Sequence, residues 1–131
     1  MTIFYYKNKM KRRTSDKIFS EYIRRRDGRC VYAFKCFGVP IDWRTLHCSH
    51  WQKRRHEGTR VDPKNCDASC TKCHAYIEDT EAGAKALDEF KLKQLGKYEY
   101  DLVKMRALTY QKKDEFISCL IAKELLKPLK L

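Results

Sequence analysis

Long hydrophobic runs are missing from this sequence. No stretch approaches the roughly 18 consecutive apolar residues that a membrane-spanning helix needs. A secretory signal is not recognisable, because the short apolar run TIFYY precedes the first basic cluster instead of following it. Internal repeats are missing too. These absences predict a cytoplasmic protein that has no membrane as a partner.

Acidic side chains are scarce relative to basic ones. The chain has 29 Lys and Arg against 17 Asp and Glu, a formal net charge of +12. Residues 1–60 hold 16 of the basic and 5 of the acidic side chains, so nearly all of the excess lies in the first half. Basic runs are usually solvated surface, but this asymmetry favours a polyanionic partner, and nucleic acid over an acidic membrane.

A disulfide framework is also excluded, because seven cysteines are an odd number and cytosolic thiols stay reduced. With 131 residues the chain forms one domain and cannot bury a large core. We expect a basic arm at 1–14, a compact core at 15–79 and a helical extension at 80–131. The predicted class is α+β.

Helical spacing marks four segments. Ser15 or Asp16 can cap a first helix that ends at Gly28 and turns three arginines, 24 to 26, towards solvent. Residues 30–65 predict loops around a hairpin, and helical spacing returns after Cys70. Beyond it we expect one helix closed by Gly96, a second through residues 98–105 and a third through 116–126.

The cysteines suggest a metal site. Cys70 and Cys73 form a C-x-x-C pair whose thiolates can reach one tetrahedral zinc ion, and Cys30 and Cys36 are the natural second pair. Such a zinc would stabilise a fold that lacks a large core, and it would contribute on the order of 10 kcal/mol of folding free energy. The alternative is a set of unrelated buried thiols. The weaker ligand candidates are Cys48 and Cys66, and we expect Cys119 to pack in a helix.

Because four cysteines complete the predicted zinc site, the histidines are not needed as its ligands and can serve another function. His50, Asn65 and His74 follow in the order His, Asn, His, with His74 directly after Cys73. This order resembles the HNH, or His-Me finger, endonucleases. The resemblance implies a ββα unit with the general base on the hairpin, the Asn in the following loop and a metal ligand at the start of the helix. The segment NCDASCTKCH has the spacing expected of zinc-bearing members.

A closer likeness extends over residues 15–110. The segments EYIRRRDGRC, HCSHWQKR, TRVDPKN and CTKCH follow, in order, the pattern of the phage NinG (Rap) recombination endonucleases. Three features depart from that pattern: the spacing of the first cysteine pair is widened, Ser49 replaces Gly, and His74 stands where Asn is frequent. The likeness implies cleavage of branched DNA, such as Holliday junctions or displacement loops, in a bacterial host's cytoplasm.

The chemistry of phosphodiester cleavage suggests a role for each residue. A neutral imidazole can take a proton from water, so we predict His50 as the general base and Asn65 as the residue that holds its ring in place. His74 and His47 are the predicted ligands of a catalytic Mg²⁺ or Mn²⁺, although His47 could simply face outward on a strand. The side chains expected to contact DNA are Arg24, Arg25, Arg26, Lys53, Arg54, Arg55, His56 and Arg60.

Two other functions stay open. The chain could be a zinc-dependent module that binds nucleic acid without cutting it, a function for which His50 and Asn65 are not needed. It could also be an HNH nuclease of another role, in homing or genome packaging.

The last predicted helix has a broad apolar face, which suggests a homodimer. The alternative is packing on the preceding helices. The side chains of the face are Phe116, Ile117, Leu120, Ile121 and Leu125, and the alternative contacts are Leu87, Phe90, Leu102 and Met105.

Overall fold

The computed structural model describes residues 12–130, so most of the predicted basic arm lies outside the described residues. The helices and strands are, in chain order, α2 (Thr14–Asp27), β1 (His47–His50), β2 (Cys66–Ser69), α3 (Thr71–Asp79), α4 (Glu81–Leu108) and α5 (Glu115–Leu126). Three short 3-10 helices are η1 (Trp43–Thr45), η2 (Glu57–Thr59) and η3 (Lys127–Lys130). This arrangement confirms the α+β class. Within the described range, no helix is long and apolar enough to cross a membrane.

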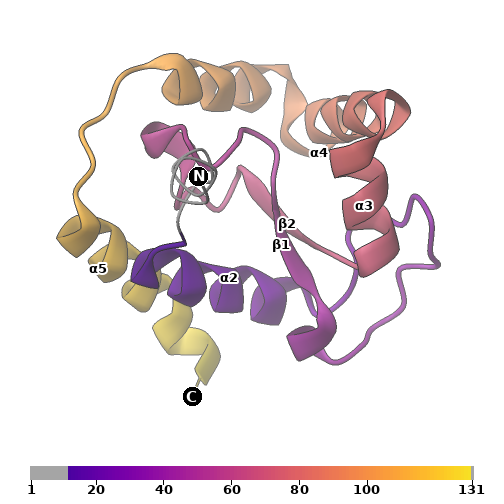
Figure 1. Cartoon of the computed structure of the whole chain (residues 1–131), viewed down its shortest axis with the longest axis horizontal. Coiled ribbons are helices and arrows are strands. Elements are labelled where there is room, and N and C mark those ends of the chain that lie inside the picture. Colours follow the sequence, from indigo (N-terminus) through magenta and orange to yellow (C-terminus); the bar gives the residue numbers. More distant parts are fainter. Residues whose placement is uncertain (1–11, 131) are drawn as a thin grey trace, which may run out of the picture.

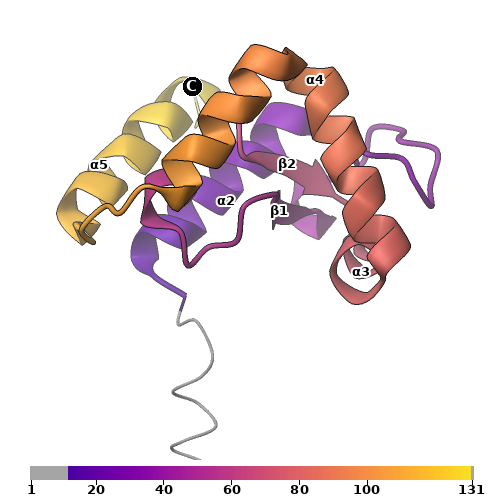
Figure 2. The same cartoon turned by 90° about the horizontal axis from the view of Figure 1, so that it is seen from above.

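The short sheet lies between two groups of helices (Figures 1 and 2). Helix α2 packs on both strands and α5 packs on α2, whereas α3 and α4 pack together on the other side. Gly83 permits the close approach of α3 and α4, because a Cβ there would lie 1.8 Å from the carbonyl oxygen of Tyr76. The region predicted as a helical extension is therefore part of the same packed body as the core.

Helix α2 ends where the sequence predicts and begins slightly earlier. Gly28 adopts a left-handed conformation with φ of 64° and closes the helix. The N-cap is Arg13 and not Ser15 or Asp16. Asp16 lies in the first turn, where its Oδ2 accepts a hydrogen bond of 2.8 Å from the backbone N–H of Arg13. The apolar face of α2 is buried through Phe19 and Ile23.

Strands β1 and β2 are antiparallel, with His47 opposite Ser69 and His50 opposite Cys66. Side chains therefore alternate between the two faces. Cys66 and Ala68 join Phe19 of α2 in one apolar cluster, whereas Asp67 faces α4. The second apolar cluster lies on the α3 and α4 side, and its buried members are Cys30, Tyr32, Trp51, Cys73, Ile77, Leu87, Tyr100 and Val103.

Helix α4 consists of the two helices expected around Gly96, joined across a kink at that residue. It runs through residues 81–108 with one non-helical residue, Gly96, whose φ of 80° kinks it. Beyond the kink Tyr98 and Met105 are exposed, whereas Tyr100 and Val103 are buried.

Helix α5 docks on α2 and not on α4, so the predicted contacts with Leu87, Phe90, Leu102 and Met105 do not form. Its buried residues are Ala122 and Leu126. The N-terminus of α5 is tied to α2 by Glu115, whose Oε2 accepts a hydrogen bond of 3.0 Å from the backbone N–H of Ser15. Much of the predicted apolar face stays exposed, namely Phe116, Ile117, Leu120 and Ile121.

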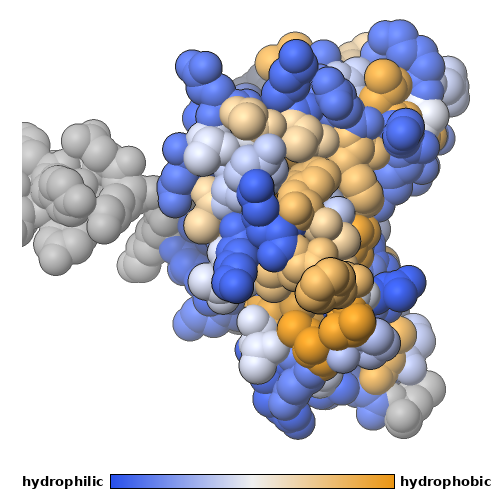
Figure 3. Space-filling model, turned by 90° about the vertical axis from the view of Figure 1, so that its right-hand side faces the viewer, coloured by the Kyte–Doolittle hydropathy of each residue, from blue (hydrophilic) through white to orange (hydrophobic). Residues whose placement is uncertain are grey.

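A further apolar surface lies on the side of the molecule that carries the connection between α2 and β1 (Figures 1 and 3). Figure 3 views this side and shows apolar side chains gathered in a band across it. Phe37, Val39 and Ile41 of the connection are exposed. This surface lacks a cover within the described part of the chain.

A buried ion pair fixes the sheet to α4. The Nζ of Lys91 donates a hydrogen bond of 2.8 Å to Oδ2 of Asp67, and both side chains are almost fully buried. Gln94 donates 2.8 Å to Oδ1 of the same carboxylate, and the hydroxyl of Tyr32 donates 3.2 Å to Oδ2. A buried carboxylate needs such partners, because desolvation of an unpaired charge costs several kcal/mol.

We expect Lys91→Met to lower the free energy of unfolding by about 3 kcal/mol, because it removes the nearer cation of the buried Asp67 carboxylate and leaves only Arg26, whose Nη2 lies 3.7 Å from Oδ1. The double variant Asp67→Asn with Lys91→Met should recover part of this loss. Urea denaturation checks both. Lys97→Met is the control, since the exposed pair of Lys97 and Asp101 contributes little. Equal losses in the Lys91 and Lys97 variants would contradict the prediction.

Candidate functional site

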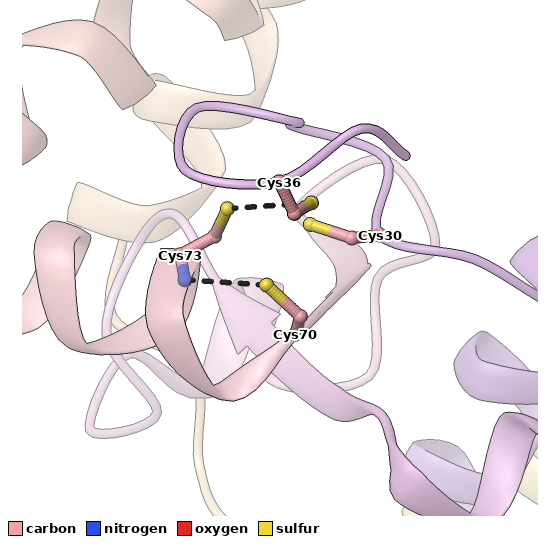
Figure 4. A group of neighbouring side chains, drawn as sticks. All are labelled: Cys30, Cys36, Cys70 and Cys73. Carbon is pink, nitrogen blue, oxygen red and sulfur yellow. Dashed lines mark hydrogen bonds between the residues drawn. The ribbon is translucent and has the colours of Figure 1, made fainter. Parts of the chain in front are cut away.

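Four cysteines from two distant segments meet beside the sheet (Figure 4). Cys30 and Cys36 lie in the connection after α2, Cys70 caps α3, and Cys73 lies in its first turn. Their sulfur atoms all lie within 4.8 Å of one another, and the Sγ atoms of Cys36 and Cys73 are 3.9 Å apart. A tetrahedral zinc ion with Zn–S bonds of about 2.3 Å separates its sulfurs by about 3.8 Å. The cluster is therefore compatible with structural zinc.

Backbone N–H groups point at two of these sulfurs. The N–H of Lys35 donates to Sγ of Cys73 at 3.2 Å, and the N–H of Cys73 donates to Sγ of Cys70 at 3.4 Å. Such bonds stabilise thiolates that ligate a metal. Burial raises the pKa of Cys73 to about 12, so without a cation this thiol is protonated at neutral pH. Metal binding must therefore displace a proton from the cluster.

A cavity of about 810 Å³ lies next to the cluster and brings together three of the four histidines, His47, His50 and His74. The remaining histidine, His56, does not line it. Basic side chains surround the cavity, and they are Arg12, Arg24, Lys53, Arg54 and Arg55. Five of the 16 basic side chains of residues 1–60 thus line the cavity, together with the carboxylates of Asp16 and Glu78.

His50 is the last residue of β1, and a hydrogen bond fixes one nitrogen of its ring. Its Nε2 lies 3.0 Å from the carbonyl oxygen of Arg60. A carbonyl only accepts, so Nε2 carries the hydrogen and the lone pair of the neutral ring is on Nδ1. Burial lowers the pKa of His50 below its usual 6.5, and the neighbouring guanidinium of Arg54 lowers it further. The ring is therefore neutral at pH 7 and can accept a proton through Nδ1.

Asn65 directly precedes β2 and is fully buried. Its side chain forms hydrogen bonds with the loop between the two strands. Its Oδ1 accepts from the backbone N–H of Gln52 at 2.7 Å, and its Nδ2 donates to the carbonyls of Gln52 at 2.9 Å and Thr59 at 3.1 Å. No hydrogen bond joins Asn65 to the His50 ring. The predicted contact is therefore replaced by an indirect one, because Asn65 fixes Thr59 and thereby the adjacent Arg60 carbonyl that binds His50.

His47 and His74 come together from the sheet and from α3. Their rings stack with centroids 5.0 Å apart and an angle of 5° between the planes. Nε2 of His47 lies 3.3 Å from the hydroxyl of Thr71, and Nε2 of His74 lies 3.9 Å from a carboxylate oxygen of Glu78. Burial lowers the pKa of His74, so this ring too is neutral at pH 7. Because the two rings lie face to face, their nitrogen lone pairs do not point at one shared position, and one ring would have to turn before both could bind the same ion.

Arg60 is not at the surface, where a side chain that contacts DNA must lie. It is 1% exposed, and it donates to Asp16 through Nε at 2.9 Å and through Nη2 at 2.6 Å. Its Nη1 also donates to the carbonyl of Arg54 at 3.0 Å. The prediction that Arg60 grips a phosphate is therefore wrong, because its guanidinium neutralises a buried carboxylate within the fold.

The arginines at the end of α2 do not all face solvent as predicted. Arg26 donates to the carbonyls of Pro63 at 3.0 Å and Cys66 at 2.8 Å, so it links α2 to β2. Arg25 lies over the ring of Trp43 at 4.4 Å. Arg24 alone of the three lines the cavity.

Arg12 and Glu78 line the cavity, and neither was predicted from the sequence as a site residue. Arg12 belongs to the basic segment before α2, and Glu78 lies one helical turn after His74 on the same face of α3. Glu78 accepts a hydrogen bond of 2.9 Å from Nζ of Lys53 and supplies an oxygen donor beside His74. The His-x-x-x-Glu spacing on a predicted helix is the signal that could have identified it.

Comparison with known proteins does not identify a relative. No family model, no curated protein and no solved structure matches this chain. The likeness to the HNH endonucleases therefore stays a prediction from the order and spacing of its motifs.

Proposed function

We propose that this protein is a metal-dependent DNA endonuclease of the HNH type. The observation that carries the proposal is the convergence of His47, His50 and His74 on one basic cavity, with a lone pair of neutral His50 available as a base. His47 and His50 lie on β1, and His74 lies in α3, which follows β2 directly; this is the ββα order that the resemblance implies.

The residues divide the work of phosphodiester hydrolysis. Nδ1 of His50 takes the proton from the attacking water, while the Arg60 carbonyl keeps the ring in the tautomer that makes Nδ1 basic. His47, His74 and Glu78 would hold a divalent ion, which when bound stabilises the charge that develops on the phosphate and leaving oxygen. Arg24, Lys53, Arg54 and Arg55 hold the DNA backbone at the cavity.

The two proposed metal sites have different tasks and different ions. Four thiolates select Zn²⁺ for a structural role, whereas imidazole with a carboxylate oxygen suits Mn²⁺ or Mg²⁺ with water at the catalytic site. The proposed substrate is branched recombination DNA in a phage-infected bacterial cytoplasm, and this part rests on the NinG-like motifs alone. Cleavage of labelled linear, forked and four-way DNA, with Mg²⁺ and Mn²⁺ in parallel, tests it.

We expect His50→Ala to abolish metal-dependent cleavage, by a factor of about 10² or more, because the proton acceptor is lost. DNA affinity, measured by fluorescence anisotropy, should change little. His56→Ala is the matched control, since His56 lies outside the cavity, and it should cut at nearly the parent rate. Parent protein that binds DNA tightly but never cuts would favour the non-catalytic binding module.

Elemental analysis should find about one tightly bound zinc per chain, and Cys73→Ser should remove it and lower the melting temperature, because the cluster joins the connection after α2 to α3. Cys119→Ser should keep the bound zinc and the melting temperature of the parent, since Cys119 lies in α5 and is not part of the cluster. Zinc-free parent protein of full stability would contradict the structural-zinc assignment.

A homodimer through the exposed face of α5 stays part of the proposal, because a two-fold dimer would place one active site on each strand of a four-way junction. We expect light scattering to give about twice the chain mass of 15.7 kDa, because association would cover the apolar face. Leu120→Arg should yield a folded monomer that nicks single strands. A monomeric parent across the micromolar range, with and without junction DNA, would rule this dimer out.

A further inference from the structure

A second group of metal-ligating side chains lies beside His50. Cys48 and His50 are two residues apart on β1, and His50 pairs with Cys66 on β2. All three therefore point to the sheet face that α2 covers, where the ring of Phe19 lies 6.3 Å from that of His50. The two sulfurs and a ring nitrogen lie within 4.8 Å of one another. The group shares no residue with the four-cysteine cluster.

The donors of this group suit a thiophilic cation. Two thiolates and one imidazole form a known kind of zinc site, in which a fourth position stays open to water. Mg²⁺ and Mn²⁺ prefer oxygen donors, so the group discriminates against the ions proposed for cleavage. A tetrahedral ion needs sulfur atoms about 3.8 Å apart, so side-chain movements of about 1 Å or less would close the group around it.

An ion can reach this group from the cavity. Cys48 and His50 both line the cavity, and Cys66 lies behind them, fully buried and in thiol contact with Cys48. The open fourth position would therefore face the cavity, where water or a phosphate oxygen can fill it. Two β-strands hold the three ligands, which limits how far they can separate.

The same lone pair serves both possible tasks of His50. Because Nε2–H is donated to the Arg60 carbonyl, only Nδ1 is available, either to take a proton from water or to bind a metal ion. A histidine that ligates through one nitrogen and donates the other N–H to a carbonyl is the usual arrangement at metal sites. A bound ion would thus remove the base without displacing the loop.

We propose that Cys48, His50 and Cys66 form an inhibitory site for Zn²⁺ or a cation of similar thiophilicity. An ion held there occupies Nδ1 of His50, so cleavage supported by Mg²⁺ or Mn²⁺ stops until the ion leaves. The inhibitory effect rests on the proposed nuclease function, whereas the metal site itself does not.

Binding is measured with Co²⁺ on the protein as purified, with its tightly bound metal in place and thiols reduced. The visible absorption of thiolate-bound Co²⁺ should saturate at one added equivalent in the parent and in Cys119→Ala, and should not develop in Cys48→Ala. Cys48 is only partly buried, so this variant should fold, and Cys48→Ser provides a second version. Parent protein that shows no thiolate-bound Co²⁺, or a folded Cys48 variant that binds it like the parent, would overturn the site.

Inhibition is measured by adding Zn²⁺ to cleavage reactions with Mg²⁺. The Zn²⁺ concentration for half-inhibition should rise at least about tenfold in Cys48→Ala and stay unchanged in Cys119→Ala, while the rates without Zn²⁺ stay equal. Equal sensitivity of the two variants would overturn the inhibitory role. Parent protein that never cuts any DNA would overturn the proposed function and this role together, and the Co²⁺ titration would still decide the site.

Discussion

The ion pair between Arg60 and Asp16 is the interaction on which the candidate site depends. Two charge-assisted hydrogen bonds, of 2.9 and 2.6 Å, join two buried side chains 44 residues apart. They fix the loop between β1 and β2 against α2, and the carbonyl of Arg60 then stands where it orients His50. Asn65 holds the same loop from inside through Thr59. His50 is thus positioned by a residue whose guanidinium is buried and does not line the cavity.

A sheet of two four-residue strands is not stable by itself, so its surroundings must hold it. The four-cysteine cluster ties the connection after α2 to the first turn of α3, which presents His74. The ion pair of Arg60 ties the loop that follows β1, the strand that ends with His50, to α2. The cavity lies between these two attachments, so its histidines are supported from both sides by contacts with little freedom to shift.

Charge within this protein has two separate uses, and the net charge of +12 does not distinguish them. Arg60, Arg26 and Lys91 neutralise buried acceptors and hold helices to the sheet. Arg24, Arg54 and Arg55 surround the cavity and can contact a polyanion. The basic surface open to a polyanion is therefore smaller than the number of basic residues suggests, and part of it lies at the histidines.

Local features of the sequence determined the helix ends at Gly28 and Gly96, the last helix and the cysteines that meet, because caps, glycine conformations and C-x-x-C spacing act over a few residues. The order His50, Asn65, His74 likewise predicted that His50 and His74 belong to one site. Only the tertiary structure decided that Arg60 is buried, that α5 covers α2, that Glu78 joins His74 at the cavity and that Cys66 lies beside Cys48 and His50. Each of these outcomes depends on strand register or on a partner far away in the chain, and residue type and local spacing carry no information about either.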